Sequence, residues 1–236
     1  MSPEDQLEGL DPYDLYDAEA ARIAEYFSSV PDDDPRWSVA SRCEGWSVRD
    51  VIAHLAAGEE YQRASLEGGV ETLLEHYGGL GVTDLDSFNE ITLRQFDRRS
   101  PSDLIAMWRR DNAEARRGFR DRGDGMVDTT VGDYPARWQA IHLAIELAIH
   151  ADDAYVPVND DEAASRARRL AQATRFVVAE SKPDLTIAPV DGGTRLAGEG
   201  SEAVLDDATF VDAVAHRIDP EELSGEARDL LGGTHN

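Results

Sequence analysis

The chain has 236 residues, of which 41% are hydrophobic and 30% are charged, a composition typical of a globular protein and not of a disordered or fibrous chain. It carries 23 Lys and Arg against 48 Asp and Glu, and the resulting net charge of −25 argues against a nucleic acid or an anionic membrane as its main partner. The single cysteine, Cys43, excludes an internal disulfide and a multi-cysteine metal site, and no uninterrupted apolar run approaches the ~20 residues of a membrane span.

The first two-thirds of the chain is predicted to form helices separated by loops. Apolar residues recur at helical spacing from Asp14 to Val30, and Pro31 with the aspartates behind it ends that helix. The second helix begins at Ser47, a cap that can pair with Asp50 three residues later, and it ends before two glycines at about Glu67.

Further helices follow after a loop rich in Gly and Asp. A shorter helical piece is predicted from Ser87 to Asp97, and a cap followed by proline starts a long helix from Ser100 to about Arg120. Another Gly/Asp loop leads to the last long helix, from Tyr134 to Tyr155. Four long helices predict an antiparallel four-helix bundle, in which cofactor and metal sites lie between facing helices.

Near residue 160 the pattern changes from long helices to a mixture of helix and short strands. A helix is predicted from Glu162 to Glu180, followed by two short strands joined by a hairpin turn and then by two short helices. The strands are expected at Leu185–Val190 and Thr194–Leu196, and the helices at Asp207–Arg217 and Pro220–Leu231. We therefore predict a mainly α protein, with a helical bundle over residues 11–158 and a small α/β domain over residues 161–236.

Four polar residues share a narrow stripe on the last long helix: His142, Glu146, His150 and Asp153. At ~100° of rotation per residue, they fall within an arc of about 80°. Isoleucines flank the stripe on one side and leucines on the other, and alanines fill the opposite side of the helix. A stripe facing solvent would lie opposite the bulky residues, so this one is predicted to face inward, where buried His and Glu side chains need a partner.

A divalent metal ion is one such partner. Glu146 and His150 lie four residues apart and can share an ion, and His54, in the second turn of the capped helix, is the best third ligand. Two His and one Glu leave open positions for substrate or water, as catalytic zinc requires. A Glu–His pair on an exposed or subunit-facing helix and a satisfied core His54 remain alternatives, and His142 is the main rival ligand. The other histidines, His76, His216 and His235, are interpreted as solvated.

Two segments resemble the mycothiol-dependent maleylpyruvate isomerase family, part of the DinB-like superfamily of metal-binding bundles. CEGWSVRDVIAHL, from Cys43 to Leu55, is similar to the opening Gly-Trp…His motif, and ELAIHADD, which begins at Glu146, is similar to the Glu-x-x-x-His-x-x-Asp motif. The resemblance covers roughly residues 15–158. It implies that His54, Glu146 and His150 are the metal ligands. Asn89 resembles an Asn often found in the family's middle helix and is, with Arg49, our candidate for binding the thiol cosubstrate.

The resemblance also implies a chemistry. A divalent metal, with Zn²⁺ the best match to the ligands, would activate a low-molecular-weight thiol such as mycothiol for isomerisation or S-transfer on a small electrophile. We expect Asp153 to orient His150 or His54 through the free ring N–H, and Arg49 to meet a substrate carboxylate. Cys43 has no obvious His/Asp relay in the sequence and is interpreted as a buried structural thiol.

Two other classes of function remain open. The superfamily also contains thiol-S-transferases and zinc-containing anti-sigma regulators, so the chain could be a metal-containing regulator without turnover. It could also be a helical binding protein whose His/Glu stripe forms polar bonds at a dimer interface. In each case we expect a cytoplasmic protein, because the acidic start lacks the basic segment followed by an apolar segment that is typical of a signal peptide. We expect it to be a monomer or a homodimer.

Overall fold

The computed structural model describes residues 2–198 and 200–232, and it divides into two compact units. One unit is Pro12–Val156. The other combines the first eleven residues with the chain from Pro157 onward, a pairing that the sequence analysis did not predict. The predicted fold class is confirmed: the first unit is a helical bundle and the second is a small α/β unit. In the described part of the chain, no helix is long and apolar enough to cross a membrane.

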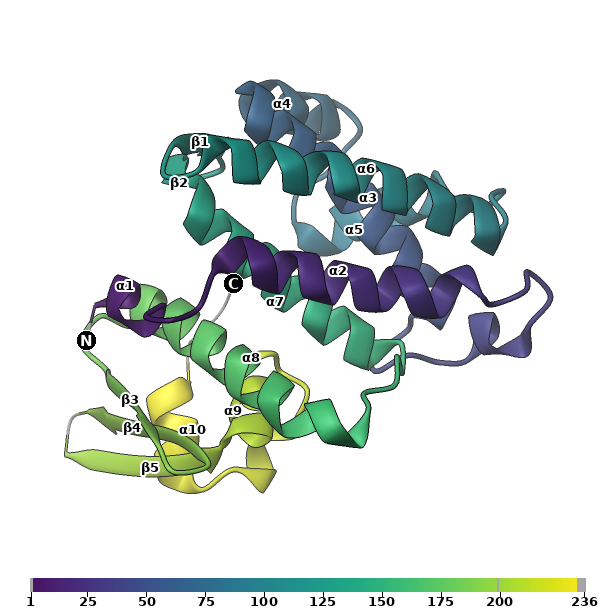
Figure 1. Ribbon diagram of the computed structural model, residues 1–236. Coiled ribbons are helices and arrows are strands. Elements are labelled where there is room, and N and C mark those ends of the chain that lie inside the picture. The colour runs from purple at the N-terminus through teal and green to yellow at the C-terminus, as the bar shows by residue number, and fades with distance from the viewer. Residues whose placement is uncertain (1, 199, 233–236) are drawn as a thin grey trace. The chain divides into compact units, whose positions relative to one another are not determined.

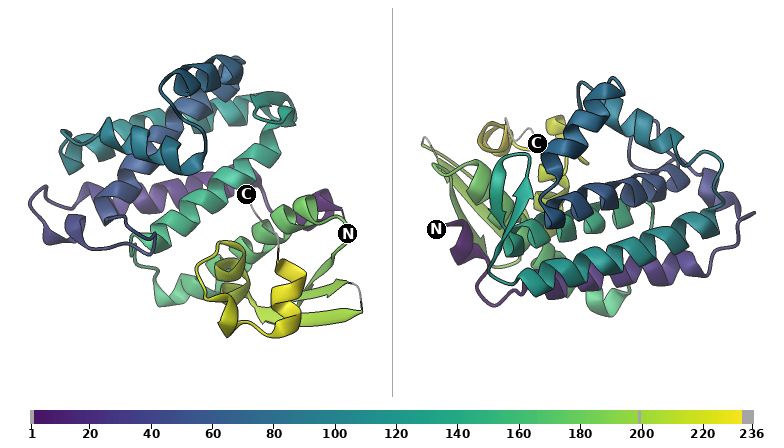
Figure 2. Two further views of the ribbon diagram at one scale, coloured as in Figure 1. Left: turned by 180° about the vertical axis from the view of Figure 1, so that it is seen from behind. Right: turned by 90° about the horizontal axis from the view of Figure 1, so that it is seen from above.

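Four long helices build the bundle. The helix α2 packs against α6 and α7, and α3 packs against α6 and α7 (Figure 1; Figure 2). Both predicted caps hold, because Ser47 and Asp50 form a reciprocal capping box before α3 and the Ser100 hydroxyl accepts from the backbone N–H of Asp103 in α6. The bounds of these helices are α2 (Pro12–Ser28), α3 (Val48–Glu67), α6 (Pro101–Arg122) and α7 (Ala136–Asp153).

Unlike the predicted antiparallel arrangement, the helices α3 and α6 run side by side in the same direction. The Arg49 guanidinium near the start of α3 donates to the carbonyls of Phe96 and Arg99 just before α6, and Leu66 near the end of α3 lies against Gly118 near the end of α6. This arrangement requires a crossover, which α4 (Val70–Gly79) and α5 (Leu85–Arg94) supply. By contrast, the start of α3 lies beside the end of α7, because the Arg42 N–H donates to the Asp153 carbonyl.

Two elements replace loops that the sequence predicted in this unit. The helix α4 was missed because its two glycines suggested a loop, although Val70, Leu73, Leu74 and Tyr77 follow helical spacing and the glycines lie at the helix end. The second loop contains a hairpin of β1 (Met126–Thr129) and β2 (Gly132–Pro135). Gly132 has a φ of 93°, a backbone conformation that glycine adopts readily at such a turn. A short 3₁₀ helix, η1 (Pro35–Ser38), precedes α3.

The second unit is a three-stranded antiparallel sheet with helices. The strands pair in the order β3–β4–β5, and α8 packs against β3, β4 and α9. The predicted hairpin is confirmed, but the third strand was missed. The short helix α1 (Pro3–Gln6) packs on α8, and the Gln6 amide donates to the Ile187 carbonyl at 3.3 Å. The remaining bounds are α8 (Asp160–Ser181), β3 (Thr186–Val190), β4 (Gly193–Gly198), β5 (Ser201–Asp206), α9 (Asp207–Val214), η2 (Pro220–Glu222) and α10 (Gly225–Leu231).

A buried polar layer crosses the bundle core. Glu59 on α3 is 6% exposed, and its Oε1 accepts a hydrogen bond from the Asn112 amide on α6 at 2.9 Å. The same amide nitrogen lies 3.1 Å from the hydroxyl of Tyr16 on α2. Burial raises the pKa of Glu59 to about 8, against the lowering effect of the Asn112 hydrogen bond and with a further raising effect from the charge of Glu146. The core therefore holds a carboxyl group that keeps its proton at neutral pH.

This burial predicts a stability difference that grows with pH. A folded-state pKa of about 8 against an ordinary 4.5 means that folded Glu59 retains a proton that the unfolded chain loses, so wild-type stability falls between these two pH values. Glu59→Gln does not titrate. We subtract the unfolding free energy of wild type from that of Glu59→Gln, each measured by urea unfolding. This difference should be ~3 kcal/mol larger at pH 8 than at pH 5. The exposed Glu114→Gln on α6 is the control. A difference that is constant with pH would contradict the assignment.

Candidate metal centre

The first predicted ligand, His54, is placed by the start of α3. The capping box at Ser47 fixes where this helix begins, and His54 follows in its second turn. Its side chain is 15% exposed, and its ring lies 5.0 Å from the Trp46 ring, centroid to centroid. The Nε2 atom lies 3.3 Å from Oε1 of Glu146, so α3 presents the imidazole directly to α7.

The structure brings His54, Glu146 and His150 together. Their ligand atoms all lie within 4.8 Å of one another, and the rings of His54 and His150 are 5.0 Å apart. His150 is 12% exposed at its side chain, whereas Glu146 is 46% exposed. The trio therefore combines two largely covered imidazoles with a carboxylate that solvent or a small ligand can reach.

The charge of Glu146 suits a cation. Although solvent reaches nearly half of the Glu146 side chain, the surrounding protein partly desolvates its carboxyl group and so raises the pKa. The hydrogen bond with His54 and the charges of His54, His150 and His142 outweigh that effect. The net shift of the Glu146 pKa is downward from its usual value. The carboxylate is consequently ionised at neutral pH, in the form that binds a metal ion.

Asp153 and Cys43 lie next to His150. The Asp153 side chain is 0% exposed, and its Oδ2 is 3.0 Å from Nδ1 of His150 and 3.1 Å from Sγ of Cys43. The expectation that Cys43 has no His/Asp relay is therefore wrong, because residues 107 and 110 positions away along the chain fold onto it. Of the two imidazoles predicted as partners of Asp153, His150 is the one in hydrogen-bond contact. Cys43 itself is half-buried.

The rival ligand His142 has a different neighbour. Its Nε2 lies 3.1 Å from the Tyr134 hydroxyl, and Tyr134 also stacks edge-on with Trp138. Among the described residues, ligand-type side chains gather in two groups, which share His150: the trio and the set of Cys43, His150 and Asp153. His142 belongs to neither group.

The two residues predicted to bind the thiol or substrate have separate settings. Arg49 donates from Nη2 to the carbonyls of Phe96 and Arg99 at 2.6 and 2.8 Å, so it braces the segment before α6. Asn89 lies on α5, and its Oδ1 is buried without a hydrogen-bond partner. His76 and His216 are exposed as predicted, although His76 lies in α4 and not in a loop, and His235 lies outside the described residues.

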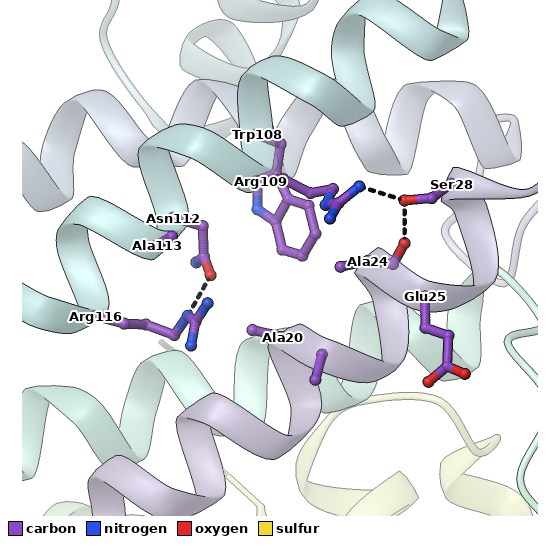
Figure 3. Close-up of a pocket in the computed structure, with 10 residues that line it drawn as sticks. Ala20, Ala24, Glu25, Ser28, Trp108, Arg109, Asn112, Ala113 and Arg116 are labelled. Atoms are coloured by element: carbon purple, nitrogen blue, oxygen red, sulfur yellow. Dashed lines mark hydrogen bonds between the residues drawn. The ribbon is translucent and has the colours of Figure 1, made fainter.

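A cavity of about 600 Å³ lies between α2 and α6 and shares no residue with the trio (Figure 3). Alanines of α2 form one wall and Trp108 of α6 the other. Two pairs of its polar side chains are hydrogen-bonded: Arg116 donates to Asn112 and Arg109 donates to Ser28, each at 2.8 Å. The cavity has no histidine in its lining, so the trio is the better candidate for chemistry.

Comparisons with known proteins identify the family and the fold of the chain. Residues 16–155 match the family model described as mycothiol maleylpyruvate isomerase N-terminal domain, and no curated protein matches the chain. The crystal structure of the mycothiol-dependent maleylpyruvate isomerase shares the fold, with a TM-score of 0.61, 17% identity and 92% of each chain covered. A histidine-to-alanine mutant of that isomerase gives a TM-score of 0.60 with the same identity and coverage. The family model matches more than half of the chain, so the chain belongs to the mycothiol maleylpyruvate isomerase N-terminal domain family.

Proposed function

We propose that the chain is a metal-dependent enzyme that uses a low-molecular-weight thiol such as mycothiol to isomerise a small electrophilic substrate or to transfer sulfur to it. The observation that carries this proposal is the convergence of His54, Glu146 and His150 from two helices within 4.8 Å. Family membership supports the reaction class, since the matching model is named for the mycothiol-dependent isomerase.

The donor set fits a divalent ion. Two imidazoles and one carboxylate are the protein ligands of several catalytic zinc sites, and they leave positions open for an exogenous ligand. The same ligand types also accept nickel, iron or manganese, so we propose Zn²⁺ on the basis of its preference for such sets. The exposure of Glu146 supports an open side, through which a thiol could approach.

An ion held by these residues would favour the deprotonated, nucleophilic form of a bound thiol. Asp153 accepts a hydrogen bond from the Nδ1–H of His150, which leaves the Nε2 lone pair for the ion. The Cys43 thiol is engaged by the Asp153 carboxylate and is not free to attack, so the attacking sulfur belongs to the external thiol. That sulfur adds to an electrophilic carbon and either leaves again, which isomerises the substrate, or stays attached.

Asn89 and Arg49 are our candidates for contacts with the thiol. Asn89 offers a buried carbonyl oxygen that has no partner, which suits an N–H or O–H group of a polar thiol. Arg49 has one nitrogen committed to two backbone carbonyls, and its role in binding depends on the remainder of the guanidinium. The partners that we propose are thus small molecules, taken up by a monomer or homodimer in the cytoplasm.

Replacing His150 by Ala should remove the metal. We expect about one divalent ion per chain in wild-type protein purified without a histidine tag, and roughly a tenth of that in His150→Ala, because two remaining ligands hold zinc poorly. Elemental analysis measures the metal, and circular dichroism checks that the helices persist. The exposed His76→Ala is the control and should keep its metal. Wild-type protein without stoichiometric metal would contradict the proposed centre.

Metal-loaded protein should also convert an electrophile when the thiol is present. We expect thiol-dependent turnover of the electrophile, and a loss of about 10²–10³ in kcat/KM for Glu146→Gln, since the ligand charge is removed while its shape is kept. Mass spectrometry of the product separates isomerisation from S-transfer. Metal-loaded protein that shows no turnover across a panel of electrophiles would instead favour the alternative, a non-catalytic metal-containing regulator similar to zinc anti-sigma factors or a helical binding protein.

A further inference from the structure

We propose that Cys43 is a positioning residue for the metal centre: its thiol donates to Asp153 and thereby holds the imidazole of His150 in the orientation that binds the ion. This inference rests on the function proposed above. It assigns a role to the single cysteine of the chain that neither the family match nor the ligand set gives it.

Cys43 lies in a tight hairpin that contacts both ligand-bearing helices. Ala40 and Ser47 form a bridge at its base, the Ser41 N–H donates to the Trp46 carbonyl at 2.8 Å, and the Trp46 N–H donates to the Cys43 carbonyl at 3.1 Å. Gly45, with a φ of 79°, allows the chain to reverse. Hydrogen bonds within the hairpin therefore fix the backbone that carries the Cys43 thiol.

The same hairpin reaches the end of α7. The Arg42 N–H donates to the backbone carbonyl of Asp153 at 3.1 Å, while Cys43 contacts the Asp153 side chain. Trp46, three residues further on, lies over His54 on α3. One short segment thus touches a ligand on α3 and the neighbour of a ligand on α7, which makes it suited to set the distance between them.

The donors follow from these contacts with Asp153 as the ionised carboxylate, which can only accept hydrogen bonds. Nδ1 of His150 lies 3.0 Å from the Asp153 carboxylate, which accepts hydrogen bonds when ionised, so Nδ1 carries the proton. A protonated Nδ1 cannot accept from Sγ, which lies 3.8 Å away. The thiol proton therefore points to Oδ2 of Asp153, which lies 3.1 Å from Sγ. This one oxygen accepts hydrogen bonds from both the thiol and the imidazole N–H.

Two donors on one oxygen restrict how the carboxylate can turn. Asp153 is fully buried, so bulk water does not replace a lost donor, and a carboxylate with fewer donors is freer to rotate away from His150. Outer partners of a ligating histidine typically contribute about 10–100-fold to metal affinity. Cys43 acts one step further from the ion, through Asp153, so its effect belongs at the lower end of that range.

A set of variants tests the proposal through metal affinity. We expect Cys43→Ala to weaken Zn²⁺ binding about tenfold in a competition titration with a chelator, and Cys43→Ser, which keeps a donor, to stay within about threefold of wild type. If the thiol acts through Asp153, Cys43→Ala made in an Asp153→Asn background should add less than about twofold. Additive losses, or equal losses in the Ala and Ser variants, would overturn the positioning role in favour of packing.

Two spectroscopic measurements separate this proposal from its rivals. Because the chain has one cysteine, its S–H stretch is a single infrared band, which should move in metal-free Asp153→Asn relative to metal-free wild type. An unchanged band would show that the thiol does not donate to Asp153. In cobalt-substituted protein, a sulfur-to-cobalt charge-transfer band lost in Cys43→Ser would make the thiolate a ligand and overturn the proposal. If wild type binds no metal but the S–H band moves, the function proposed above fails while the Cys43–Asp153 contact stands.

Discussion

The approach of His54 on α3 to Glu146 on α7, at 3.3 Å, is the contact on which the site depends. Polar side chains on otherwise apolar helix faces must find partners, because an unsatisfied buried polar group costs several kcal/mol. In this bundle Nε2 of His54 lies beside the Glu146 carboxylate and Nδ1 of His150 lies beside the Asp153 carboxylate, and the charges of the histidines keep Glu146 ionised. The same requirement that stabilises the interior therefore assembles a set of metal ligands.

The connections of the chain explain why these residues meet. The crossover through α4 and α5 lets α3 and α6 run in the same direction, and the hairpin before α3 joins its start to the end of α7. Further along α3, Glu59 lies in a second polar layer and keeps its proton, because no histidine offsets its burial. Two carboxyl groups of one bundle thus differ in charge according to their neighbours, as acid–base and ligand roles require.

Much of this arrangement could be predicted from the sequence, for local reasons. The cap at Ser47, the spacing of Glu146 and His150, and the flanking isoleucines and leucines are all properties of one helix at a time. The contact of Cys43 with Asp153 could not be predicted, because it joins residues 110 positions apart. It depends on a hairpin that leaves no periodic pattern of apolar residues in the sequence. The helix α4 and the β1–β2 hairpin were hidden by glycines, which lie at the end of a helix and in a turn as readily as in a loop.

The proposed function requires a divalent ion between α3 and α7. Crystallography of the zinc-loaded protein with anomalous scattering at the zinc edge tests it most directly, because the anomalous peak locates the ion independently of the protein atoms. We predict one strong peak per chain, at ~2.0–2.2 Å from a ring nitrogen of His54, a ring nitrogen of His150 and a carboxylate oxygen of Glu146. A peak bonded to Cys43 and Asp153, or peaks confined to surface carboxylates, would contradict the account.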